Sequence, residues 1–197
     1  MIEKVTLENE FVRLEPLDQT HVDGLWEAAR HPEIWDYMPI AVKDKQFMPA
    51  MIQHAEQMHA AGGALAFTVF EKKSHEIVGS TGFWNADLAN RRVEIGFTWF
   101  APKWQRTAVN TSCKLLMLEH ALETLALNRV EFKTDSLNQR SQTALRRIGA
   151  TEEGTLRNHM VQPDGRLRHS VYFSILKDEW PQVKQQLVAK LASGHQA

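Results

Sequence analysis

The segment 92–125 constrains the fold of this chain more than any other stretch. Its apolar residues first recur at every second position, at Val93, Ile95, Phe97 and Trp99. This alternation predicts a strand, and a short basic turn at 103–108 then leads into a helix that opens near Asn110. A strand that enters a helix through a polar turn leaves backbone N–H groups unpaired at the helix start. With the positive end of the helix dipole, these donors predict an anion site, and phosphate is the anion that we expect there.

The turn at 105–110 differs from the common nucleotide-binding loops. The chain contains neither GxxxxGK(S/T), which binds nucleoside triphosphates, nor GxGxxG, which binds dinucleotides. The turn instead resembles the pyrophosphate loop of the GNAT superfamily of acetyl-CoA-dependent N-acetyltransferases, Q/R-x-x-G-x-G/A, which follows a central strand. Its six places are filled by Gln105, Arg106, Thr107, Ala108, Val109 and Asn110. Ala108 stands where the first glycine is usual, and Asn110 stands where the second small residue is usual.

A second segment, 138–150, strengthens the resemblance. It reads NQRSQTALRRIGA and follows the next predicted strand. The other superfamily signature, N-x-x-(A/S)-x-x-apolar-x-x-x-apolar-G-(F/A), forms a helix beside the coenzyme. The matching positions are Asn138, Ser141, Ala144, Ile148 and Gly149. The resemblance covers about residues 11–176, and it is closest to the branch that acetylates N-terminal amines of ribosomal proteins.

The remaining sequence pattern predicts a mixed α/β (α+β) domain. Helices are expected over 21–30, 44–61 and 177–191, and strands over 11–17, 65–70, 77–84, 129–134, 155–161 and 167–176. This order predicts a mixed sheet with helices on both faces. The resemblance implies one domain over 1–197, with a core at about 11–176 and a closing helix at about 177–191. It also implies a mostly antiparallel sheet that splays at the coenzyme site.

Charge and composition narrow the classes of partner. The net charge is −1, but residues 101–176 carry 11 Lys and Arg against 7 Asp and Glu. This basic half suits coenzyme A, with its three phosphates, and is too mildly charged for a nucleic-acid surface. No apolar run approaches the ~20 residues of a membrane helix, and the N-terminus carries no apolar signal core. We therefore expect a cytoplasmic protein that does not enter a membrane.

A metal centre is not expected. Cys113 is the only cysteine, which excludes an internal disulfide and a cysteine zinc site. The nine histidines form no HExxH or comparable set.

The expected reaction needs a neutral amine, a polarised carbonyl and a proton for the leaving thiolate, without a covalent enzyme intermediate. Because many amines are protonated at pH 7, a base must take a proton. Glu94 is the first candidate, because strand alternation places it opposite the apolar side chains of its strand. In the alternative, Glu94 is an ordinary strand carboxylate that pairs with Arg92 or Arg129.

The resemblance also indicates the proton donor and the coenzyme contacts. Many superfamily members use a tyrosine where this chain has Leu145, but the resembled branch uses a serine, and Ser141 occupies its place. Asn138 would hold the pantetheine arm or orient water, although Asn138 and Ser141 could simply cap a helix. Arg106 and Arg147 are candidate phosphate ligands or solvated arginines. The expected coenzyme contacts are Thr98, Trp99, Phe100, Gln105, Arg106, Thr107, Ala108, Val109, Asn110, Thr111, Asn138, Ser141 and Arg147, with backbone N–H groups near 98–100 polarising the carbonyl.

The acceptor side is less defined by the sequence. The loop 31–39 is rich in aromatic side chains, which are costly to leave exposed to water. We expect it either to fill the core between the first two helices or to form the wall of a substrate cleft. His169 could line the same cleft, or it could pack against His159 across a hairpin. The candidate acceptor contacts are Trp35, Met38, Trp84 and His169. A positively charged acceptor would need acidic residues, and the loops offer Glu33, Asp36, Asp44 and Asp87.

The sequence therefore predicts an N-acetyltransferase that uses acetyl-CoA. Its acceptor would be a primary amine, either the N-terminus of a peptide or ribosomal protein or a small molecule. One alternative is a coenzyme-A-binding module without transferase activity. Another is a structural dimer whose loop binds no coenzyme, and the loop around Trp35 or the late hairpin could supply a homodimer surface in any of these cases.

Overall fold

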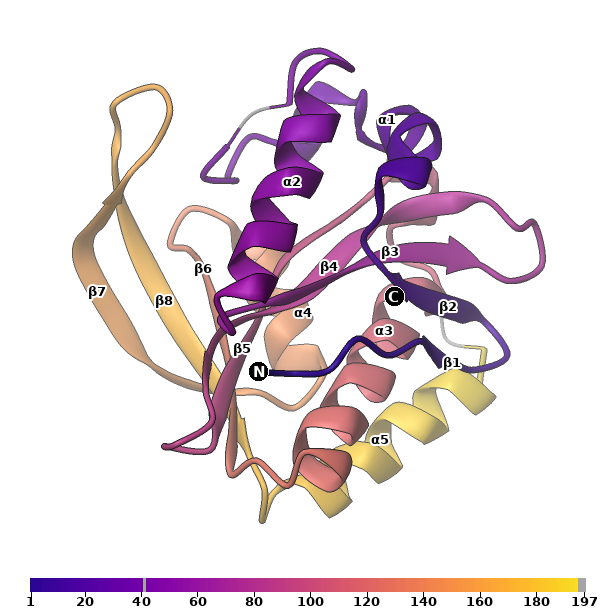
Figure 1. Cartoon of the computed structure of the whole chain (residues 1–197). Coiled ribbons are helices and arrows are strands. Elements are labelled where there is room, and N and C mark those ends of the chain that lie inside the picture. The colour runs from indigo at the N-terminus through magenta and orange to yellow at the C-terminus, as the bar shows by residue number, and fades with distance from the viewer. Residues whose placement is uncertain (41, 195–197) are drawn as a thin grey trace.

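An eight-stranded sheet runs through the part of the chain that the computed structural model describes, residues 1–40 and 42–194 (Figure 1). Its strands are β1 (Leu7–Glu8), β2 (Val12–Pro16), β3 (Leu65–Glu71), β4 (Ile77–Asp87), β5 (Arg92–Phe100), β6 (Arg129–Asp135), β7 (Thr151–Val161) and β8 (Leu167–Leu176). Their order is β1-β2-β3-β4-β5-β6-β8-β7. All neighbouring pairs are antiparallel except β5 and β6, which are parallel. The expected mixed, mostly antiparallel sheet is confirmed.

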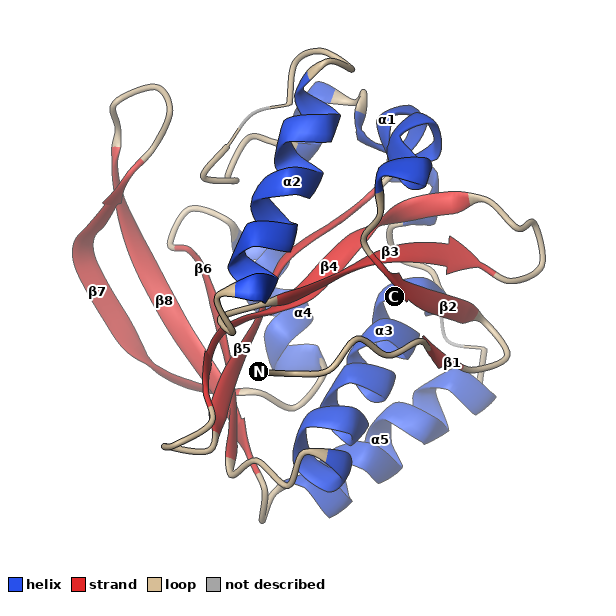
Figure 2. Ribbon diagram, in the orientation of Figure 1, coloured by secondary structure: helices blue, strands red, loops and turns tan. Residues whose placement is uncertain are grey.

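Helices cover both faces of this sheet (Figure 2). They are α1 (Val22–Ala29), α2 (Phe47–Ala60), α3 (Ala108–Glu119), α4 (Gln139–Arg147) and α5 (Trp180–Ala192). In α2, Met48 and Ile52 lie one turn apart and are buried with α1 against one face. On the other face α3, α4 and α5 share a second core, to which Met117 and Leu187 belong. Within residues 1–40 and 42–194, no helix has the length and hydrophobicity needed to cross a membrane.

The predicted elements are present, but several ends differ. The second helix begins at Phe47 rather than at residue 44, and the closing helix begins at Trp180 with Pro181 in its first turn. The helix after the loop 101–107 begins at Ala108 because the Thr107 hydroxyl caps it, accepting a hydrogen bond from the Val109 N–H at 3.3 Å. The expected domain 1–197 also includes Ala41 and residues 195–197, which lie outside the described residues.

The two parallel strands separate after a short paired stretch. β5 and β6 pair at only three positions, the last being Glu94 with Glu131, although β5 continues to Phe100 and β6 continues to Asp135. The expected splay of the sheet is therefore present. It leaves one edge of β5 without a neighbouring strand beyond Glu94, and this is where the loop 101–107 leads into α3.

A β-bulge changes which side chains of β5 face which core. Between the pairs Gly82–Gly96 and Ser80–Trp99, two residues of β5 lie opposite one residue of β4, and Phe97 has a φ of +50°. The extra residue reverses the alternation. Val93 and Ile95 pack in the core of α3, whereas Phe97 and Trp99 pack with the core of α1 and α2. The prediction that these four side chains share a face is therefore wrong for Phe97 and Trp99. The bulge depends on how β5 pairs with β4, and the alternation of apolar residues within β5 does not reveal it.

Candidate active site

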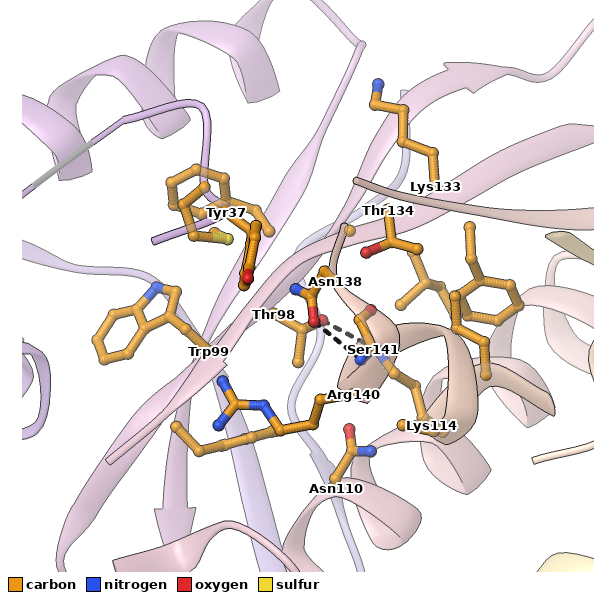
Figure 3. Close-up of a pocket in the computed structure, with 18 of the residues that line it drawn as sticks. Tyr37, Thr98, Trp99, Asn110, Lys114, Lys133, Thr134, Asn138, Arg140 and Ser141 are labelled. Atoms are coloured by element: carbon orange, nitrogen blue, oxygen red, sulfur yellow. Dashed lines mark hydrogen bonds between the residues drawn. The ribbon is translucent and has the colours of Figure 1, made fainter. Parts of the chain in front are cut away.

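A cavity of about 790 Å³ opens where β5 and β6 separate. Its walls are the second half of β5, the loop 105–107, the starts of α3 and α4, and the loop 37–39. Figure 3 shows Asn110 and Lys114 of α3 and Ser141 of α4 arranged around this space. A cavity of this size at a break in a sheet is typical of ligand sites.

The loop between β5 and α3 forms one end of the cavity. Gln105 secures it on both sides, since its Nε2 donates to the Phe100 carbonyl at 3.1 Å and its Oε1 accepts from Arg140 Nη1 at 2.9 Å. Arg106 has a φ of +60°, a left-handed conformation that disfavours most side chains. The backbone N–H groups in the first turn of α3 have no carbonyl of their own helix to bond. This end of the cavity therefore has the geometry of a phosphate site.

Ten of the thirteen expected coenzyme contacts line the cavity. They are Thr98, Trp99, Phe100, Gln105, Arg106, Thr107, Asn110, Asn138, Ser141 and Arg147. Ala108, Val109 and Thr111 do not belong to the lining. Val109 and Thr111 are buried, and Val109 packs in the core beneath α3.

The start of α4 supplies polar groups from a second direction. Asn138 is the N-cap of α4, and its Oδ1 accepts a hydrogen bond from the Ser141 N–H at 3.0 Å. The two residues thus form the capping pair that the sequence allowed, and both also line the cavity. Leu145, at the place of the superfamily tyrosine, packs in the apolar core and also lines the cavity, where its side chain offers no hydroxyl.

Glu94 faces the cavity with a defined set of partners. It is 7% exposed, and its Oε2 accepts hydrogen bonds from Asn85 Nδ2 at 2.8 Å and Lys133 Nζ at 3.1 Å. A Cβ added to Gly96 would lie 2.7 Å from Glu94 Oε1, so the glycine makes room for the carboxylate. Asn85 reaches Glu94 from a bulge in β4, where it has a φ of +50°.

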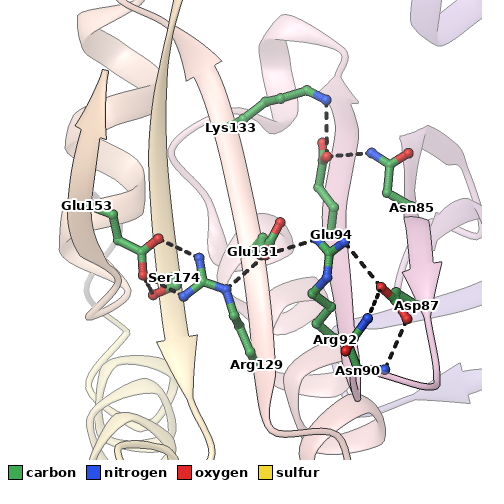
Figure 4. Close-up of polar contacts among 10 residues, drawn as sticks. All are labelled: Asn85, Asp87, Asn90, Arg92, Glu94, Arg129, Glu131, Lys133, Glu153 and Ser174. Carbon is green, nitrogen blue, oxygen red and sulfur yellow. Dashed lines mark hydrogen bonds and ion pairs between the residues drawn. The ribbon is translucent and has the colours of Figure 1, made fainter. Parts of the chain in front are cut away.

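The partners expected for Glu94 as an ordinary strand carboxylate, Arg92 or Arg129, are wrong, because its ion pair is with Lys133. Figure 4 shows that both arginines pair with other carboxylates. Arg92 contacts Asp87 at 3.2 Å and Glu131 at 3.4 Å, and Arg129 bonds Glu131 at 2.8 Å and also pairs with Glu153. Among the described residues, the side-chain partners of the Glu94 carboxylate are Lys133 and Asn85.

The candidate acceptor residues divide into two groups. Met38 and Trp84 line the cavity. Trp35 does not: it is buried, its Nε1 donates to the Ala29 carbonyl at 2.9 Å, and its ring packs on Trp99. His169 is exposed and lies outside the lining, where its Nδ1 accepts from a backbone N–H of β7 at 2.8 Å.

Comparison with known proteins identifies the family of this chain. Residues 12–151 match the family described as the acetyltransferase (GNAT) domain. The chain belongs to the GNAT acetyltransferase family. The enzyme is 30% identical to the N-acetyltransferase p20 of Bacillus licheniformis over 89% of this chain and 98% of p20. Members of this family are acyltransferases, and the expected enzyme class is confirmed.

Two further proteins are similar to this chain. YdaF of Bacillus subtilis (strain 168), named as a ribosomal N-acetyltransferase, is 34% identical over 53% of this chain and 56% of YdaF. The structure of Mycobacterium smegmatis RimJ in complex with CoA-disulfide shares the GNAT fold with a TM-score of 0.80. It is 23% identical, and the match covers 97% of this chain and 94% of RimJ. The expected GNAT family and fold are confirmed, and the assignment to the ribosomal branch stays a prediction.

Four cationic residues of the cavity lining were not singled out in the sequence: Lys114, Lys133, Arg140 and Arg168. Lys114 lines the cavity from α3, donates to Thr98 Oγ1 at 2.9 Å and lies 5.8 Å from the centre of the Phe132 ring. Its position four residues after Asn110 places both on one helix face, which was the available signal. Arg168 lines the cavity from β8, and no local pattern indicated it. In the described part of the chain, no group of three or more His, Cys, Asp or Glu could hold a metal ion.

The stability of the GNAT domain should depend on pH through Lys114. Burial lowers the pKa of Lys114 from 10.5 to about 8. Between these values the unfolded chain holds a proton that the folded protein has released, so the free energy of unfolding should rise with pH, by up to about 3 kcal/mol from this group. The Lys114→Met variant should lack this rise. Urea unfolding at several pH values from 7 to 10 would measure it, with the exposed Lys103→Met as control. Parallel pH profiles for wild type and Lys114→Met would contradict the prediction.

Proposed function

We propose that the protein transfers an acetyl group from acetyl-CoA directly to a primary amine. The observation that carries this proposal is the single cavity that joins a phosphate-type helix start at one end to the carboxylate of Glu94 at the other. The two ends are connected by the edge of β5 that β6 leaves unpaired. Membership of the GNAT family, which uses acetyl-CoA, supports the donor.

Binding of the donor would use the length of this edge. The pyrophosphate would accept hydrogen bonds from the first turn of α3, and Arg106 and Arg147 lie close enough to the cavity to contact phosphates. The pantetheine arm is an extended chain with two amides, so it can pair with the free backbone groups of β5 as an added strand. The complex of RimJ with CoA-disulfide supports coenzyme A as the ligand of this fold.

The chemistry then needs three groups near the thioester. Glu94 would take a proton from the amine, whose nitrogen forms a bond to the acetyl carbon. A backbone N–H near 98–100 would stabilise the charge on the carbonyl oxygen. As the carbon–sulfur bond breaks, the thiolate would receive a proton, and Ser141 and Lys114 are the candidate donors in the cavity lining. These roles rest on the geometry of the cavity and on general acid–base chemistry.

The acceptor would enter at the end formed by Met38, Trp84 and Glu94. Both a peptide N-terminus and a small-molecule amine meet the chemical requirement for a primary amine. Trp35 is better explained as core filler than as an acceptor contact, because its polar atom is already bonded to the backbone of α1.

Calorimetric titration with acetyl-CoA and with coenzyme A tests the proposal. We expect micromolar binding of both, followed by thiol release when an amine acceptor is added. Binding without thiol release for a broad panel of amines would favour the non-catalytic coenzyme-A-binding module. Failure to bind either ligand would overturn the proposed donor.

A further inference from the structure

Arg168 is a buried cation without a partner at the acceptor end of the cavity. It lies on β8 beside Met160 of β7, is 4% exposed and lines the cavity. Its Nε is inaccessible and has no hydrogen-bond partner. Among the described residues, its guanidinium forms no ion pair. Burial lowers the pKa of Arg168, and the attraction of the nearby Asp135 and Glu94 carboxylates offsets this effect only in part.

The nearest carboxylates are already engaged by other groups. Asp135 accepts from Arg166 Nη2 at 2.6 Å, from Gln162 Nε2 at 3.4 Å and from the Leu137 N–H at 2.9 Å. Glu94 is held by an amide and a lysine, as described above. Arg168 therefore keeps its positive charge available to whatever enters the cavity.

The charge of the lining indicates which acceptors the cavity disfavours. Glu94 is the only carboxylate in the described lining, whereas six residues are cations: Arg106, Lys114, Lys133, Arg140, Arg147 and Arg168. The acidic residues considered for a cationic acceptor, Glu33, Asp36, Asp44 and Asp87, do not line it. Three of the cations lie on the phosphate loop and on α4, beside the expected phosphates. Lys133 and Arg168 outnumber Glu94 at the acceptor end and make it net positive, which opposes a polyamine or an aminocyclitol.

We propose that the acceptor is an amine that also carries a carboxylate, which the Arg168 guanidinium binds while Glu94 receives the amine. This inference rests on the proposed function. An uncompensated buried charge lowers stability, and a carboxylate satisfies a guanidinium with two parallel hydrogen bonds. The amino and carboxylate groups could belong to a free amino acid or to an acidic residue at a peptide N-terminus, and both present the same chemistry to the cavity.

Matched acceptors test the carboxylate requirement. Thiol release would be measured with L-amino acids and their C-terminal amides, and with tetrapeptides that begin with aspartate or with asparagine. We expect the carboxylate member of the productive series to have a kcat/KM at least tenfold above that of its neutral partner. Arg168→Gln should bring this ratio close to one. The free acids and the peptides form separate arms, so the productive arm identifies the source of the carboxylate.

Arg166→Gln is the matched control for these measurements. Arg166 is the neighbouring arginine on the same hairpin, but it pairs with the buried Asp135 and does not line the cavity. This variant should keep the preference for carboxylates and should melt at a lower temperature, because it leaves a buried carboxylate without its partner. Equal rates for acids and amides in the wild type, or a preference for polyamines, would overturn the inference.

A second readout does not depend on catalysis. With coenzyme A bound, glutarate should raise the Tm of the wild type, the neutral glutaramide should not, and Arg168→Gln should not respond to glutarate. Without ligand, Arg168→Gln should melt at or above the wild-type temperature. A glutarate response in both proteins, or a large loss of Tm in unliganded Arg168→Gln, would assign Arg168 a structural role. If coenzyme A binds and no amine releases thiol, the transfer function fails, while the glutarate response still tests the anion site.

Discussion

Replacing Glu94 by glutamine is expected to lower kcat by about 10²- to 10⁴-fold, the usual contribution of a general base. Glutamine keeps the shape of the side chain but cannot accept a proton from the amine. The affinity for acetyl-CoA should remain nearly intact, because Glu94 and Phe100 lie about 20 Å apart along an extended strand and the phosphate loop follows Phe100. Steady-state kinetics with an acceptor from the amine panel, together with calorimetry of acetyl-CoA binding, would measure both quantities.

Glu131→Gln is a suitable control for this substitution. Glu131 lies beside Glu94 on β6, is also largely buried and accepts from Arg92 and Arg129, but it does not line the cavity. This variant should lose stability through its broken ion pairs and keep kcat within about twofold. An unchanged kcat for Glu94→Gln would remove Glu94 from the mechanism, and equal losses in the two variants would indicate a structural effect of the charge.

Replacing Ala108 by aspartate is expected to weaken coenzyme A binding by about 10- to 100-fold, which corresponds to 1.4 to 2.7 kcal/mol. Ala108 is the first residue of α3, so the new carboxylate would stand beside the expected pyrophosphate. The fold should tolerate the change, since a negative charge in the first turn favours the helix dipole. Titration at low and high ionic strength would separate the causes, because salt should reduce the loss if it is electrostatic.

Ala108→Gly is the control for the aspartate variant. It installs the glycine that is usual in the pyrophosphate loop of the family, and it removes a Cβ without adding charge. Its affinity for coenzyme A should equal or exceed that of the wild type. If Ala108→Asp bound coenzyme A as tightly as the wild type, the pyrophosphate would have to lie elsewhere in the cavity.

Local sequence patterns predicted much of the fold. The sequence predicted the strands at 65–70 and 77–84, which pair as β3 and β4, and the turn after β5 predicted a helix start that could receive phosphate. The segment 138–150 predicted α4 with its Asn138 cap. Such features depend on residues close in sequence, so they can be inferred from spacing, capping and turn chemistry.

Other features depended on partners that are distant in sequence. The bulge at Phe97 arises from the pairing of β5 with β4, and it moved Trp99 to the other core. Glu94 forms its ion pair with Lys133, which lies 39 residues later in the chain, rather than with the nearby Arg92. Asp135 forms its ion pair with Arg166, which lies 31 residues later in the chain. The Asp135 carboxylate is therefore not an ion-pair partner for the nearby Arg168.

The sequence by itself therefore determined the family resemblance, the order of the elements, the loop at which we expect phosphate and the candidacy of Glu94. Only the tertiary structure decided that β8 lies between β6 and β7, that Trp35 fills the core, and that Lys114 and Arg168 reach the cavity. The physical reason is that periodicity and capping report the local backbone. Whether a buried charge is neutralised depends instead on the strand order and register, which bring its partners near or leave it unpaired.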